Sequence, residues 1–268
     1  ERVVITYDDI SDDLTKDENQ RKWFGFAESI DNEIEIPIAL EGAGNVISLK
    51  LGGNNNTKHN VLIAGTVGSG KSTLLDTIVM STMLRYNPEN VQILFLDFKH
   101  GVTSSPYAEY RTYSFRTIAT ETEPEFGYAT LKYVYEEQRR RAEQFRQMNV
   151  PNIESYRLSC DRIGKSYNMP KLLLIIDEYH EMFRDGDSQV CRESAKLLET
   201  LLEQGHSFGI YVILASQDPG QAKTLDPIVY NQMAYRIAMS CGTGTGRVIL
   251  SDDNPAVDSL MQLAPGQA

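Results

Sequence analysis

Residues 65–72 read Gly-Thr-Val-Gly-Ser-Gly-Lys-Ser, and the apolar run Val61-Leu62-Ile63-Ala64 comes directly before them. The octapeptide has the Walker A spacing G-x-x-x-x-G-K-[ST], with the strand-like run before it and the helical pattern after it that this motif requires. Glycines allow successive backbone N–H groups to wrap phosphate oxygens, and the amino end of the following helix favours their negative charge. The stretch therefore predicts a nucleoside triphosphate site rather than an ordinary glycine-rich turn.

The predicted site uses the whole loop and the start of the helix. We expect the Lys71 ammonium to contact the β- and γ-phosphate oxygens of ATP, and the Ser72 hydroxyl to ligate the accompanying Mg²⁺. The residues expected to contact the nucleotide are Gly65, Thr66, Val67, Gly68, Ser69, Gly70, Lys71, Ser72 and Thr73.

A second motif follows the continuous apolar run Leu172–Ile176, which is typical of a strand buried on both faces. The run ends in Asp177-Glu178, and such a pair is in isolation usually just the end of a strand. A Walker A loop in the same chain changes this interpretation. We predict that Asp177 holds Mg²⁺ through water and that Glu178 polarises the attacking water, which makes hydrolysis the expected chemistry.

Polar residues also follow two further apolar strands. Gln217 ends the run 211–216, where its amide can contact the γ-phosphate or orient water, although a solvated turn is equally consistent with the pattern. Lys99 and His100 follow Asp97 in the same way, and a charged loop is their default interpretation. The position of these two residues nevertheless predicts that they lie near the nucleotide or the interior of an assembly.

Strand-like and helical patterns alternate after residue 60, which predicts the α/β class with a mostly parallel, doubly wound sheet. The expected strands are 61–64, 92–97, 117–119, 172–177, 210–216 and 235–240, and the expected helices are 71–84, 125–148 and 191–205. A long polar and aromatic loop is expected over 100–112. Stretches 35–40 and 45–49, separated by Gly42 and Gly44, predict a small hairpin.

This pattern divides the chain into three parts. We expect an acidic lead-in over 1–22 that need not be ordered, a small β extension over 23–56, and an ATPase core over 57–268 that is truncated at its carboxyl end. Because the chain starts at Glu1, we interpret it as a piece of a longer protein, which can hold membrane segments elsewhere.

Composition limits the partners. The formal net charge of −11 argues against binding nucleic acid through bulk positive charge, although local basic loops remain compatible with it. No apolar run approaches the roughly 18–20 residues of a membrane span. Three cysteines without a C-x-x-C pair and four histidines without ligand spacing predict neither disulfides nor a zinc site, and a cytoplasmic location is expected.

Two clusters have alternative interpretations. Arg139-Arg140-Arg141 lies in a helical stretch rich in Glu, so pairing within the helix is expected before a nucleic-acid contact. Tyr107, Tyr110 and Tyr113 either stack on a substrate or pack beneath their loop.

Together these motifs resemble the motor domain of the FtsK/SpoIIIE translocases, RecA-like P-loop NTPases that assemble as hexameric rings. The matching stretches are 59–65, Leu96-Asp97-Phe98-Lys99, Glu137 with Arg140-Arg141, 150–156, 177–179, 209–217, 236–238, 247–250 and Pro265-Gly266. The resemblance implies a RecA-like fold, ATP hydrolysis and active sites shared between the subunits of a homo-oligomer.

The resemblance also implies that an arginine from a neighbouring subunit completes the γ-phosphate pocket. Arg236 and Arg247 are the positions that match, and the sequence does not rank them. The chain departs from the family pattern at His206, at Gly242–Gly246 and at Asp218-Pro219. These departures put activation in trans and the usual loop contacts in question, but not nucleotide binding.

Three functions follow from the resemblance. The leading expectation is a ring that translocates double-stranded DNA, with pore loops from 100–115 and 218–231 and basic contacts from Arg111, Arg116 and Lys223. The alternative is a protein-moving ATPase similar to those of type VII secretion, which suits the acidity better. The third is a nucleotide-binding scaffold with weak hydrolysis, against which the intact Lys71, Asp177 and Glu178 argue.

Overall fold

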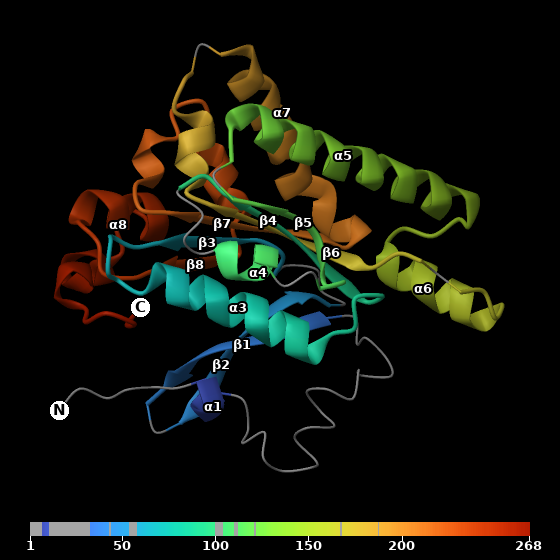
Figure 1. The fold of residues 1–268 in the computed structure, drawn as a ribbon, viewed down its shortest axis with the longest axis horizontal. Helices are drawn as coiled ribbons and strands as arrows, with labels where there is room; N and C mark the ends of the chain where they lie inside the picture. Colours follow the sequence, from blue (N-terminus) through green and yellow to red (C-terminus); the bar gives the residue numbers. More distant parts are fainter. Residues whose placement is uncertain are drawn as a thin grey trace.

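The computed structural model describes residues 7–10, 33–42, 44–53, 58–99, 104–109, 112–120, 122–166, 168–186 and 188–268. Within these residues a parallel six-stranded sheet forms the centre (Figure 1), in the order β5-β4-β6-β7-β3-β8. The strands are β3 (Val61–Ala64), β4 (Val91–Asp97), β5 (Phe115–Ala119), β6 (Lys171–Asp177), β7 (Ile210–Ser216) and β8 (Tyr235–Ala238). The predicted α/β class and the parallel, doubly wound sheet are confirmed.

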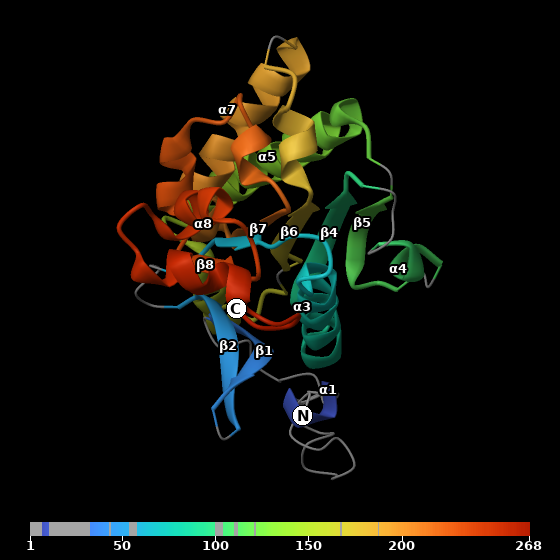
Figure 2. The same ribbon diagram turned by 90° about the vertical axis from the view of Figure 1, so that its left-hand side faces the viewer.

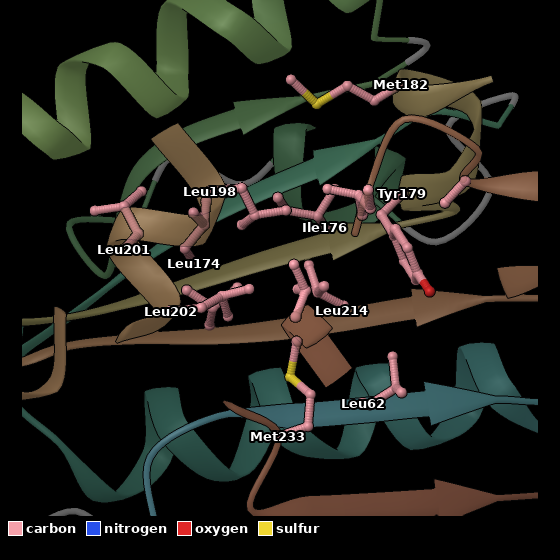
Figure 3. Packing of buried hydrophobic residues seen from close by; sticks show 14 of the residues in the cluster. Leu62, Leu174, Ile176, Tyr179, Met182, Leu198, Leu201, Leu202, Leu214 and Met233 are labelled. Carbon is pink, nitrogen blue, oxygen red and sulfur yellow. The ribbon is translucent and has the colours of Figure 1, made fainter. Parts of the chain in front are cut away.

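Helices cover both faces of the sheet, as Figures 1 and 2 show. Helix α3 (Lys71–Arg85) lies on one face, and α5 (Pro124–Gln147) and α7 (Gln189–Gln204) lie on the other. Because side chains alternate along a strand, Val61 and Ile63 pack on the α3 side while Leu62 packs on the opposite side. Figure 3 shows the apolar core on the Leu62 side of the sheet, in which Leu198 and Leu202 of α7 pack against the strands.

The predicted hairpin is present and packs beside α3. Strands β1 (Glu33–Glu41) and β2 (Asn45–Gly52) pair in antiparallel fashion and form a separate sheet (Figure 1). Its buried face is apolar and joins the core beneath α3; these residues are Ile34, Ile36, Leu49 and Leu51. Most of the acidic lead-in lies outside the described residues, but α1 (Tyr7–Ile10) is described, and its Tyr7 hydroxyl lies 3.1 Å from Ser81 Oγ.

Three helices were not predicted: α4 (Ser105–Glu109), α6 (Ile153–Arg162) and α8 (Thr243–Leu250). Helix α4 interrupts the expected long loop, whose His100, Tyr110 and Arg111 lie outside the described residues. Helix α6 begins at Asn152, whose side chain accepts a 2.9 Å hydrogen bond from the Ser155 N–H, a cap that the sequence analysis missed.

Short 3₁₀ turns complete the described part of the chain. They are η1 (Tyr179–Phe183), η2 (Gly205–Phe208), η3 (Pro219–Gln221), η4 (Pro227–Gln232) and η5 (Pro255–Gln262). In the described ranges, no helix combines the length and the apolar character that crossing a bilayer requires.

A buried arginine ties α5 to the sheet. Arg141 has no exposed surface and donates to Glu137 Oε1 at 2.8 Å and to the carbonyl oxygens of Phe208 and Pro170 at 2.7 Å each. Arg140 adds two 2.7 Å bonds to the Glu137 carboxylate. Burial opposes ionisation of Glu137, but these arginines outweigh it and lower its pKa to about 2. The predicted pairing within the helix is confirmed for Arg140 and Arg141.

We expect Arg141→Ala to lower the free energy of unfolding by about 3–5 kcal/mol, because it removes the donor from two buried carbonyl groups and from a buried carboxylate. Urea unfolding followed by circular dichroism measures the change. Arg139 is exposed on the same helix and supplies the control, since Arg139→Ala is expected to change stability by less than about 0.5 kcal/mol. Equal stability of the two variants would contradict the anchoring role of Arg141.

Candidate functional site

The candidate site lies at the carboxyl edge of the sheet, where parallel strands deliver their following loops to one place. In the strand register, Asp177 at the end of β6 lies beside Asp97 of β4 and Ala215 of β7. The P-loop follows β3, which pairs with β7. The fold therefore brings together the segments from which the sequence predicted a nucleotide site.

Glycines allow the P-loop to curl between β3 and α3. Gly68 and Gly70 have φ values of 80° and 104°, in the left-handed region that favours glycine. At Gly65 a Cβ atom would lie 2.3 Å from Ser69 Oγ, so only glycine fits there without a shift. The Thr66 N–H donates to the Ser240 carbonyl at 2.9 Å and fixes the loop to the segment after β8. The loop thus leads directly into the amino end of α3, where backbone donors gather.

Lys71 joins the P-loop to the acidic pair after β6. Its side chain is 4% exposed, its Nζ is ion-paired with Asp177 Oδ1, and Nζ lies 3.1 Å from Glu178 Oε1. Burial lowers the pKa of Lys71, but the two carboxylates outweigh burial and raise it. The structure therefore brings together the three residues on which the predicted hydrolytic site depends.

The acidic groups here outnumber their buried cation. Asp97, Asp177 and Glu178 are all buried, and Lys71 is the buried cation that contacts two of them among the described residues. Burial raises the pKa of Asp177 to about 6, and the neighbouring carboxylates act in the same direction. A second positive charge would relieve this excess. Carboxylate and hydroxyl oxygens, here of Asp177 and Ser72, are the donors that Mg²⁺ prefers, so the residues fit the predicted ion.

Glu178 is held in an unusual backbone conformation. Its φ and ψ of 52° and 42° lie in the left-handed region, although it is not glycine, and its side chain is 2% exposed. One carboxylate oxygen, Oε2, accepts a 2.9 Å hydrogen bond from the Gln217 N–H and lies 3.3 Å from His180 Nδ1. Such backbone strain on a buried acid is a feature of functional sites.

Gln217 and Lys99 meet at this edge. The Lys99 ammonium donates to Gln217 Oε1 at 2.8 Å, and the Lys99 N–H donates to Asp97 Oδ1 at 2.9 Å. Ser104 also donates to Asp97, from its hydroxyl to Oδ2 at 3.2 Å. Lys99 thus lies at this edge of the sheet, as its position after β4 predicts, and its hydrogen bond to Gln217 is a contact that the sequence did not indicate.

The two candidate arginines differ in their surroundings. Arg236 is half-buried and donates to the carbonyl oxygens of Tyr230 at 2.6 Å and Ile249 at 3.3 Å. Arg247 is exposed on α8, and its side chain makes no hydrogen bond or ion pair with the residues that the structure describes. The guanidinium of Arg236 is therefore occupied within its own chain, whereas that of Arg247 lies at the surface without such a bond to the described residues.

Of the described tyrosines in the loop after β4, Tyr107 packs beneath the loop and Tyr113 does not. Tyr107 is half-buried and packs on Phe95 and Phe115, with ring centroids 6.4 and 5.5 Å away. Its hydroxyl donates to Asp76 at 2.9 Å, so Tyr107 packs beneath the loop. Tyr113, by contrast, is 89% exposed.

The second expected pore loop, 218–231, is anchored to the core along much of its length. Leu225 and Val229 are buried, and the Tyr230 hydroxyl lies 3.0 Å from that of Tyr179. Lys223 in this segment is exposed.

The departures from the family pattern have local explanations. The ring of His206 stacks on His59 with centroids 4.4 Å apart, in the segment before β7 and thus at the opposite edge of the sheet from the P-loop. Asp218 accepts a 2.6 Å hydrogen bond from the Gln221 amide. The glycine-rich stretch before Arg247 forms the first turn of α8.

Comparison with known proteins agrees with the motifs. A sequence profile of the FtsK/SpoIIIE family matches residues 27–240. Among curated relatives, the ESX secretion system protein YukB of Bacillus subtilis is 26% identical over 238 residues, 88% of this chain and 15% of that protein. The DNA translocase FtsK of Streptococcus agalactiae is 26% identical over 231 residues, 84% of this chain and 27% of that protein.

Solved structures show the same fold. The cytoplasmic domain of the Thermomonospora curvata type VII secretion ATPase EccC superposes with a TM-score of 0.72 and 24% identity, covering 90% of this chain and 27% of that one. The pCW3 conjugation coupling protein TcpA, solved with ATPγS, gives a TM-score of 0.60 and 20% identity over 87% of this chain and 61% of that one. The RecA-like P-loop ATPase fold is confirmed. The chain spans a minor part of each curated relative named here.

Proposed function

The chain belongs to the FtsK/SpoIIIE family, as a P-loop ATPase domain, and we propose that it hydrolyses ATP at a site shared between subunits of a ring, to move a polymeric substrate. The observation that carries the proposed hydrolysis is the buried contact of Lys71, at the end of the P-loop, with Asp177 and Glu178. We place the domain in the cytoplasm because the EccC structure that it matches is that of a cytoplasmic domain.

Nucleotide binding exchanges the partners of Lys71. The β- and γ-phosphates replace the carboxylates as its anionic partners, while backbone N–H groups of 65–73 and the amino end of α3 bind the remaining phosphate oxygens. Ser72 and Asp177 would hold Mg²⁺, which supplies positive charge against the charge that develops on the transferred phosphoryl group. One favourable contact thus replaces another, so the buried ammonium is never left unpaired.

The same exchange prepares Glu178. When the Lys71 ammonium moves to the phosphates, Glu178 Oε1 loses its partner, while Glu178 Oε2 stays fixed by the Gln217 N–H. The free oxygen then orients the attacking water and accepts its proton. In this proposal the two acids take different roles once Lys71 has left, with Asp177 toward the metal ion and Glu178 toward the attacking water.

We expect Glu178→Gln to bind ATP but to hydrolyse it at least about 10²-fold more slowly, because the amide cannot accept the proton. Single-turnover hydrolysis and retention of labelled ATP measure the two effects. A basal rate equal to that of the wild type would remove Glu178 from this role. Lys196→Met, which alters an exposed residue of α7, is the control and is expected to leave both unchanged.

We propose that Arg247 rather than Arg236 acts on the neighbouring site, because only Arg247 has a guanidinium free of its own subunit's carbonyl groups among the described residues. We expect Arg247→Ala to lower kcat by about 10³-fold with little change in stability. A mixture of Arg247→Ala and Glu178→Gln subunits is expected to regain activity, since some shared sites then hold both intact residues. A mixture as inactive as its components would contradict action in trans.

The substrate is a polypeptide or duplex DNA, and the charge distribution favours the polypeptide. The net charge is −11, and of the basic residues expected to contact DNA, Arg116 lies over the Tyr133 ring at 5.4 Å while Lys223 is a single exposed lysine. A ring that grips a phosphate backbone requires several such contacts. Duplex DNA is the second candidate because the DNA translocase FtsK is among the relatives.

We expect duplex DNA to change the ATPase rate of the full-length protein by less than about two-fold at low salt, because a net charge of −11 opposes binding to a phosphate backbone. Titrating DNA at several salt concentrations measures this. Stimulation of several-fold that fades as salt rises would establish DNA as the substrate and overturn the preference for a polypeptide.

A further inference from the structure

The Lys99 side chain spans the end of β6 at the carboxyl edge of the sheet, where the candidate site lies. Strands β4 and β7 flank β6 on either side, and the 2.8 Å bond from Lys99 Nζ to Gln217 Oε1 joins the residues that follow these two strands. Each end of this link is also fixed through its backbone. The Lys99 N–H donates to Asp97 at 2.9 Å, and the Gln217 N–H donates to Glu178 at 2.9 Å.

The chemistry of the link sets the orientation of the Gln217 amide. An ammonium group has only donors, whereas an amide has an acceptor oxygen on one side and an NH₂ donor on the other. Lys99 can therefore contact only Oε1, which leaves the Nε2 donors directed away from it. Without Lys99, both amide orientations become accessible, and one of them turns the oxygen toward the site.

We propose that Lys99 is a positioning residue, which holds Gln217 so that its NH₂ group, and not its oxygen, faces the γ-phosphate. This inference rests on the proposed ATP hydrolysis and adds the group that orients Gln217. An amide donor matches the phosphate oxygens, while an amide oxygen in the same place would repel them. Lys99 acts through Gln217 and makes no contact with the nucleotide in this role.

The test is a double-mutant cycle on steady-state ATPase activity of the full-length protein. Lys99→Met, which keeps the aliphatic stem and loses the donor, is expected to lower kcat about 10-fold with KM changed less than about two-fold. Lys99→Arg keeps a donor-only group and is expected to recover most of the rate. In a Gln217→Ala background, Lys99→Met is expected to cause no further loss.

The controls separate this role from a structural one. Lys165→Met removes an exposed lysine beyond α6 and is expected to leave kcat and KM unchanged. An unaffected Lys99→Met variant, or an equal loss in the Gln217→Ala background, would overturn the positioning role while the ATPase proposal stands. A wild-type protein without ATPase activity would overturn both proposals.

Discussion

A buried ammonium shared by two buried carboxylates connects the P-loop to the centre of the sheet. Lys71 comes after β3, whereas Asp177 is the last residue of β6 and Glu178 follows it, and β7 lies between these two strands. A charge buried without a partner costs several kcal/mol, so the interaction restricts which ligands can enter. A ligand that displaces Lys71 must bring negative charge for the lysine and positive charge for the acids. A nucleoside triphosphate with its metal ion brings both.

Much of the site was predictable because its signals are local. The P-loop spacing, the acids at the end of an apolar run and the position of Gln217 need only the rule that parallel strands deliver their loops to one edge. The rest depends on tertiary contacts. Lys99 and Gln217 are 118 positions apart. The carbonyl groups that occupy Arg236 are nearer, 6 and 13 positions away, but they belong to η4 and α8, which the sequence did not predict. No spacing in the sequence encodes those pairs.

The missed helices have a similar explanation. The first turn of α8 contains Gly244 and Gly246, which disfavour a helix in isolation. Gly246 nevertheless suits the packing there, because a Cβ atom would lie 2.6 Å from Leu260 Cδ1 in the following turn and would force that side chain to shift. Packing against η5 thus decides the conformation over local propensity. The stretch from Glu137 to Arg141 matches a family motif that is visible in the sequence, but its role is structural. Its hydrogen bonds anchor α5 away from the nucleotide site.

The contact between Lys71 and the two acids also determines how this domain responds to substitution of Lys71 itself. Replacing the lysine with a neutral residue leaves the buried carboxylates of Asp177 and Glu178 without the counter-charge that they share in the nucleotide-free protein. Repulsion between them would loosen the end of β6 and with it the centre of the sheet. A phenotype of such an allele in cells would therefore combine lost catalysis with reduced abundance of the folded protein.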